Sequence, residues 1–226
     1  MAMKAIYAAV RPGIAFVRDM EVFHTDRPAN CALAGSALAQ LFTEARSYNR
    51  WRRRELEDAR IRELYETAAF GPTSVNGNPA RFVWARSPEA RRKLADCVNP
   101  GNAAKVVGAS ATVIVGYDPS FYLKLDRLMP HAAEKLAKAF ADDPREAHET
   151  AFRNSSLQGA YLIMAARALG FDCGPMSGFD HARVNAAFFA GTEIRANFIC
   201  AIGWGSTEAL MPRNPRLPFA EVNTIL

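Results

Sequence analysis

Residues 71–82 constrain the fold most, because they separate a helical pattern from a strand pattern within a short stretch. Apolar residues recur at helical spacing over 56–70, and an apolar strand-like run follows at 81–86. Gly71 suits the positive φ of a helix end, and Pro72 prevents the helix from continuing. We therefore predict a helix, a short loop and a strand in this order.

The loop between them is dense in small hydrogen-bonding groups. Thr73 and Ser74 carry hydroxyls, Asn76 and Asn78 carry amides, and prolines at 72 and 79 stiffen both ends. Such a loop can present several hydrogen bonds to a planar polar ligand. The same residue types are also typical of an ordinary turn, and the segment alone leaves both interpretations open.

The remaining pattern predicts an α+β fold in which helices surround a small central sheet. We expect a helix capped by Ser36, helices opened by Ser87-Pro88 and by Asp118-Pro119, a short helical turn at 102–108, and a helix that ends at Phe189. Strands are expected at 111–117 and 197–201, the first of them central and covered on both faces. Residues 120–145 are polar, helical in places, and the segment that we expect to be mobile. The longest helix, 149–169, ends at Gly170 and is apolar nearly all round, which indicates burial in a monomer core or a dimer interface.

Length and charge define the domain and exclude some partners. The 226 residues predict a loosely ordered leader at 1–35 and one domain at 36–226, and the net charge is +5. The run at 50–58 has arginines followed by acidic residues, which is typical of a solvated helix start. We therefore expect no nucleic-acid partner, although an anionic cofactor would suit this charge.

The cysteines, the histidines and the apolar runs argue against metal sites and membrane spans. The four cysteines, at 31, 97, 173 and 200, form no Cys-x-x-Cys pair, and the four histidines lack zinc-ligand spacing. No apolar run reaches the roughly 18 residues that a membrane helix needs. We expect a soluble cytoplasmic protein without a metal ion or a membrane partner.

Four segments contain residues suited to a ligand. They are Arg46, the 73–76 loop, the glycine-containing 175–178 segment, and a proline-stiffened loop with Arg213 and Arg216. Guanidinium groups match phosphate oxygens bidentately, and glycine lets backbone approach a flat ligand. Each segment also has a structural explanation as surface arginine, turn or solvated tail. The chain has no Walker P-loop and no Gly-x-Gly-x-x-Gly, so a planar ring with a phosphate tail fits best.

Six ordered motifs within residues 38–221 resemble the FMN-dependent nitroreductase family, and within it the malonic semialdehyde reductase branch of pyrimidine catabolism. They are LFTEAR at 41–46, GPTSxNxxPAR at 71–81, AFRNSS at 151–156, GPMSGFD at 174–180, AFFAG at 187–191 and RxPRL at 213–217. The resemblance implies a nitroreductase-like α+β fold with a mostly antiparallel sheet. It also implies an intertwined homodimer with FMN bound at the interface.

The resemblance also assigns roles to particular residues. Arg46, Ser47, Tyr48 and Arg50 would contact the phosphate and ribityl chain, and Arg213 and Arg216 would hold the phosphate. Pro72, Thr73, Ser74 and Asn76 would reach the flavin from the partner subunit, and Asn102 and Lys105 would bind its pyrimidine edge. Pro175, Met176, Ser177 and Gly178 would line the ring near N5.

The reaction implied is a ping-pong cycle without a catalytic side chain. NADH or NADPH would give hydride to flavin N5, and a small-molecule acceptor would then receive it. Malonic semialdehyde, reduced to 3-hydroxypropionate, is the expected acceptor. Nitroaromatics, quinones or enones are the alternative acceptors, and a flavin-binding protein without turnover is a third possibility. The chain departs from the branch at three places. Tyr48 stands where the branch often has histidine, Arg50 replaces a small residue, and Gly77-Asn78 differs from the usual residues before Pro79. Ser177 agrees with it, since many nitroreductases have glutamate there.

Overall fold

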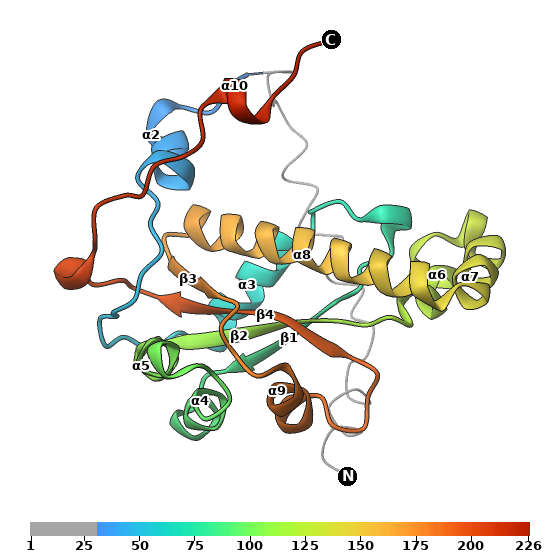
Figure 1. Ribbon diagram of the computed structural model, residues 1–226, viewed down its shortest axis with the longest axis horizontal. Helices are drawn as coiled ribbons and strands as arrows, with labels where there is room; N and C mark the ends of the chain where they lie inside the picture. The colour runs from blue at the N-terminus through green and yellow to red at the C-terminus, as the bar shows by residue number, and fades with distance from the viewer. Residues whose placement is uncertain (1–30) are drawn as a thin grey trace. The chain divides into compact units, whose positions relative to one another are not determined.

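The computed structural model describes residues 31–226 of the chain. Contacts divide the chain into the units 1–35 and 36–226, so the predicted leader lies almost entirely outside the described residues. The larger unit contains a four-stranded sheet of order β1-β2-β4-β3, in which every neighbouring pair is antiparallel (Figure 1). Its strands are β1 (Ala80–Ala85), β2 (Ala111–Tyr117), β3 (Asp172–Met176) and β4 (Arg195–Gly203). The predicted α+β class with an antiparallel sheet is confirmed.

Helices cover both faces of this sheet (Figure 1). The helices α3 (Asp58–Ala68) and α8 (Pro144–Ala168) pack on one face, where Leu64 and Leu162 meet Val113. The opposite face carries α4 (Pro88–Ala95), α5 (Pro100–Gly108) and α9 (His181–Phe188), whose apolar residues meet Ile114 and Ile199. Every residue of β2 is buried, as expected for a central strand covered twice.

Capping residues explain several helix boundaries. The Ser87 hydroxyl accepts a hydrogen bond from the Ala90 N–H at 3.1 Å, as its Ser-Pro sequence predicted. Helix α8 begins at Pro144 rather than at residue 149, because Asp143 caps it by accepting from the backbone N–H groups of Arg145 and Glu146. This Asp-Pro pair has the same pattern as Ser87-Pro88.

Two predicted helix starts are wrong. Ser36 lies inside α2 (Gly35–Leu38), which continues as a π-helix, η3 (Ala39–Thr43). Asp118 opens no helix, because its carboxylate binds Arg81 and Lys124 as well as the Ser120 N–H. The following segment forms η5 (Phe121–Lys124), α6 (Leu125–Leu128), η6 (Pro130–Ala132) and α7 (Ala133–Asp142), and the chain ends with η7 (Thr207–Ala209) and α10 (Phe219–Val222).

Gly71 has a different role from the one predicted. Among the described glycines only Gly170 and Gly191 have positive φ. A Cβ on Gly71 would lie 2.4 Å from Cγ of Tyr161. Glycine is required here because an aromatic ring packs directly against the backbone.

Burial on α8 also differs from the prediction. Its inward face includes the polar residues Asn154 and Gln158, whereas Phe152, Leu157 and Tyr161 are 47%, 46% and 42% exposed. Leu157 and Tyr161 lie one turn apart and form what we call the exposed α8 face, whereas Phe152 projects from another side of the helix. Within one chain α8 is therefore not buried nearly all round, and its burial in a dimer interface stays a prediction. Within residues 31–226, no helix is both long and apolar enough to cross a membrane.

Candidate functional site

The loop at residues 72–78 has an unusual backbone. Val75, Asn76 and Asn78 have φ of 49°, 50° and 43°, although none of them is glycine. A β-branched residue in this left-handed region costs about 1–3 kcal/mol. The loop, which includes η4 (Ser74–Asn76), therefore needs its surroundings to hold this shape.

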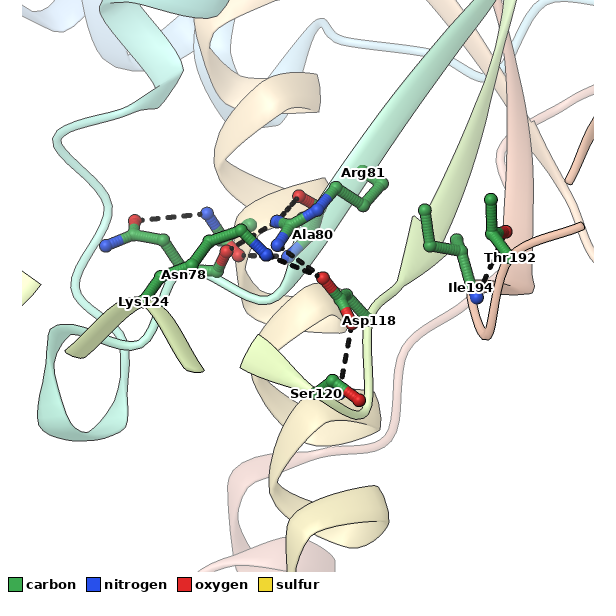
Figure 2. A network of polar contacts seen from close by, with 9 residues as sticks. Asn78, Ala80, Arg81, Asp118, Ser120, Lys124, Thr192 and Ile194 are labelled. Atoms are coloured by element: carbon green, nitrogen blue, oxygen red, sulfur yellow. Dashed lines mark hydrogen bonds and ion pairs between the residues drawn. The ribbon is translucent and has the colours of Figure 1, made fainter. Parts of the chain in front are cut away.

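A partly buried ion-pair network holds one end of the loop (Figure 2). The Arg81 guanidinium donates to the carbonyls of Asn78 and Ala80 at 2.9 and 2.8 Å, and its Nη2 binds Asp118 Oδ2 at 2.7 Å. Lys124 binds the same oxygen at 3.0 Å. Burial alone would raise the pKa of Asp118, but Arg81 and Lys124 outweigh it and hold the pKa below its usual value.

The residues expected to face a ligand are partly engaged within the chain. Pro72, Ser74 and Asn76 are exposed, and the Ser74 hydroxyl has no hydrogen-bond partner within residues 31–226. The Thr73 hydroxyl oxygen accepts from the Asn78 N–H at 3.2 Å. The Asn76 amide donates to the Leu128 carbonyl at 2.8 Å, so this side chain supports the loop and the segment after it.

A second donor-rich region surrounds a cavity of about 780 Å³ near the C-terminus. We call it the arginine cavity. Its lining contains four guanidinium groups and no carboxylate, and it consists of Phe42, Thr43, Ala45, Arg46, Ser47, Asn49, Arg167, Leu210, Met211, Pro212, Arg213, Asn214 and Arg216. Four of the predicted residues, Arg46, Ser47, Arg213 and Arg216, thus meet around one hollow.

These arginines also connect two chain segments. Arg213 Nη2 donates to the carbonyls of Thr43 and Ala45 at 2.7 and 2.8 Å, and Arg46 donates to the Met211 carbonyl. Arg216 donates to the carbonyls of residues 214 and 215, next to it in the chain. The C-terminal segment is therefore fastened to residues 43–46 by the same groups that line the cavity.

The sequence interpretation missed Arg167. This residue lies in the last turn of α8 and donates to the Leu41 carbonyl at 2.9 Å. Its Nε is buried and has no hydrogen-bond partner within the described part of the chain. A basic residue in the last turn of a helix is common for dipole reasons, so its spacing alone did not indicate a binding role.

Residues 47–50 run alongside the sheet. Ser47 bridges Cys173 of β3 in parallel, and the Tyr48 N–H donates to the Cys173 carbonyl at 2.9 Å. The Tyr48 ring packs so closely on Gly205 that a Cβ there would lie 2.1 Å from it. Burial, and then the nearby Asp172 carboxylate, raise the pKa of Tyr48. Arg50 is exposed, and its carbonyl accepts from the Ser206 N–H at 2.9 Å.

The beginning of α5 meets the segment after β3. The Asn102 amide donates to the Gly178 carbonyl at 2.9 Å, and a Cβ on Gly178 would lie 2.8 Å from the same nitrogen. Pro175 and Ser177 are exposed, whereas Met176 is buried in the core. Lys105 is half-buried and forms no ion pair with any residue from 31 to 226.

The structure does not bring the 72–78 loop and the arginine cavity together within one chain. Ala80 pairs with Tyr117, which pairs with Arg195 at the start of β4. Ser47 of the cavity bridges Cys173, which pairs with Ile202 near the end of β4. Seven residue steps along β4 correspond to about 23 Å. The two donor groups therefore lie at opposite ends of this strand.

The match that decides the family covers residues 42–205, over which the chain fits the model of the nitroreductase family. The chain belongs to the nitroreductase family. A Ralstonia pickettii protein, HadB, named as an NADH dehydrogenase/NAD(P)H nitroreductase, is 55% identical over 192 residues, which are 84% of this chain and 97% of the relative.

Solved structures share the fold. The Bacillus subtilis protein ydfN, named as a nitroreductase, superposes with a TM-score of 0.79 at 22% identity, over 85% of this chain and 100% of that chain. A nitroreductase-type protein from Exiguobacterium sibiricum was solved in complex with FMN. It superposes with a TM-score of 0.75 at 21% identity, over 87% of this chain and 99% of that chain. At these identities the likeness concerns the fold.

Proposed function

We propose that this member of the nitroreductase family is an FMN-dependent NAD(P)H oxidoreductase. The observation that carries the proposal is the arginine cavity, where four guanidinium groups gather without a carboxylate. Such a lining suits a phosphate group, because guanidinium pairs bind phosphate oxygens bidentately. The buried, unpartnered Nε of Arg167 adds an unused donor to the same lining.

The other predicted residues fit the rest of FMN. Ser47 belongs to the cavity lining, and the close approach of Asn102 to Gly178 leaves no room for a side chain at that glycine. The Pro175–Gly178 backbone and Lys105 would hold the ring of FMN, and Arg46, Arg167, Arg213 and Arg216 its phosphate. The chemistry that bound FMN supplies is two-electron hydride transfer, with NADH or NADPH as the donor.

We further propose that the enzyme is a homodimer in which the 72–78 loop completes the partner's site. Two observations support this. Helix α8 exposes the large apolar side chains of Phe152, Leu157 and Tyr161, and exposed apolar surface is typical of protein interfaces. The loop also lies about 23 Å along β4 from the arginine cavity, so one chain cannot close both groups around one flavin.

For the acceptor we propose malonic semialdehyde, a small aldehyde with a carboxylate. Ser177 is exposed next to Gly178 and is neutral, so no negative side chain at this position repels an anionic acceptor. Reduction adds hydride to the aldehyde carbon and a proton to its oxygen, which gives 3-hydroxypropionate. The second candidate is a broad reductase of nitroaromatics, quinones or enones, and the word nitroreductase in the names of the sequence relatives favours its nitroaromatic acceptors.

Steady-state oxidation of NADH and NADPH tests the acceptor. We expect malonic semialdehyde to give a higher kcat/KM than a nitroaromatic or a quinone; the reverse order would replace the first candidate by the second. The purified protein is expected to be yellow and to elute as a dimer of about 50 kDa, twice the 24.8 kDa of one chain. A colourless monomer that gains no absorbance with FMN would exclude both candidates. A cytoplasmic location stays a prediction; all four cysteines are free thiols.

A further inference from the structure

Two amide side chains of α8 are buried beneath the 72–78 loop. Asn154 is 3% exposed and Gln158 is 8% exposed, although asparagine and glutamine are mostly surface residues. They lie one helical turn apart, so both project from the same side of α8. Both amides can therefore contact the same neighbouring segment.

Asn154 fastens the beginning of the loop. Its Oδ1 accepts a hydrogen bond from the Ser74 N–H at 2.7 Å, and its Nδ2 donates to the Thr150 carbonyl at 2.8 Å. The second bond orients the amide so that its oxygen faces the loop. Alanine at this position would leave the Ser74 N–H without its acceptor.

Gln158 fastens the end of the loop. Its Oε1 accepts from the Ala80 N–H at 2.8 Å, and its Nε2 donates to Asn78 Oδ1 at 3.3 Å. The Asn78 amide in turn donates to the carbonyl of Asn76 at 2.7 Å and to its side-chain oxygen at 3.0 Å. A chain of amides therefore runs from α8 across the loop, and Asn76 extends it to Leu128 at the end of α6.

We infer that Asn154 and Gln158 are positioning residues for the loop: they hold its left-handed backbone in place before the cofactor binds. The left-handed residues 75, 76 and 78 have no glycine among them, so bonds from outside the loop must add to those that Asn78 makes within it. This inference rests on the proposed function, in which the loop contacts FMN. Loss of either amide should weaken FMN binding although neither side chain touches FMN.

The first experiment follows amide hydrogen exchange in the FMN-free protein. We expect exchange at Ser74 to be at least tenfold faster in Asn154→Ala, and exchange at Ala80 at least tenfold faster in Gln158→Ala. Thr150→Val is the matched control, because Thr150 is also 3% exposed on α8 and donates to Glu146 rather than to the loop. The control should leave both amides at the parent rate.

The second experiment titrates FMN into the parent and the same variants. Both alanine variants should bind FMN about tenfold more weakly, and Thr150→Val should bind like the parent. Parent-like exchange at Ser74 and Ala80 in the alanine variants, or parent-like FMN affinity, overturns the inference. If Asn154→Ala fails to fold, Asn154→Asp, which keeps an acceptor oxygen, must show parent-like exchange at Ser74. Gln158→Ala then tests the inference through faster exchange at Ala80 and weaker FMN binding. A parent protein that binds no FMN refutes the proposed function, whereas the exchange rates still decide whether the amides position the loop.

Discussion

The 72–78 loop and the arginine cavity are both rich in hydrogen-bond donors, but the chain builds them differently. The loop is held by the buried amides of Asn154 and Gln158 and by the partly buried ion pairs of Asp118. The cavity is formed by segments near the ends of the domain, whose guanidinium groups donate to backbone carbonyls.

The loop is therefore distinguished by its fixed shape and the cavity by its positive charge. Every polar group that supports the loop has a protein partner, so its shape is set by the core. The cavity lining instead has four arginines and no carboxylate, so its charge would favour an anionic ligand. We therefore expect mutations near the loop to change stability as well as FMN binding, and mutations in the cavity to change mainly cofactor retention.

The largest effect is expected when the two regions can no longer meet. Leu157→Glu places a charge on the exposed α8 face, where it would be buried against a partner subunit and would cost several kcal/mol. We expect a monomer in analytical ultracentrifugation and loss of bound FMN. Val107→Glu, at a position 44% exposed on α5 compared with 46% for Leu157, is the control and should remain dimeric. A Leu157→Glu dimer that keeps FMN would show that the interface lies elsewhere.

Arg213→Ala tests the cavity alone. A lost hydrogen bond to a charged group costs about 1.5–3 kcal/mol, or roughly 10- to 150-fold in FMN affinity. Riboflavin, which lacks the phosphate, should bind the parent and the variant equally, and saturating FMN should restore kcat. Fluorescence titrations of both flavins give the answer. Equally weakened binding of both flavins would mean that Arg213 acts mainly through its hydrogen bonds to the carbonyls of Thr43 and Ala45.

Gly77→Ala tests the loop through packing. A Cβ on Gly77 would lie 2.6 Å from Cδ2 of the buried Phe121 ring, and such overpacking costs about 1–3 kcal/mol. The φ of Gly77 is −71°, so the backbone adds no strain. Urea unfolding of the FMN-free protein measures the loss. Gly101→Ala, where a Cβ meets nothing within 4 Å, should be neutral or slightly stabilising, and an equal loss there would discount the packing explanation.

Asp118→Asn tests the loop through charge and should have the smallest effect, about 1–2 kcal/mol at pH 7 for this partly screened pair. Because the folded pKa of Asp118 is lowered, its contribution is present above the unfolded value of about 3.9. It is lost as the pH falls through the lower folded value. Unfolding free energies from pH 7 to pH 3 should therefore converge for parent and variant in acid. A constant difference over this range would show that the charge is not responsible.

The sequence determined the class of the fold and the identity of the family. The run at 111–117 became a fully buried central strand, and Ser87-Pro88 opened a helix, because burial on two faces and helix capping are encoded by neighbouring residues. The same local reasoning failed at Asp118-Pro119. There the carboxylate binds Arg81, which is distant in sequence and adjacent only in the folded chain.

The site divides in the same way. The sequence alone indicated the donor loop and the arginines at 46, 213 and 216, since their residue types are suited to a flavin and its phosphate. Only the tertiary structure brought Arg167 into the cavity and Asn154 and Gln158 beneath the loop. It also showed that Gly71 makes room for Tyr161 and that the exposed α8 face remains uncovered in one chain. These contacts join residues that are more than 70 positions apart in the sequence. The local periodicity of a sequence does not predict contacts at such a separation.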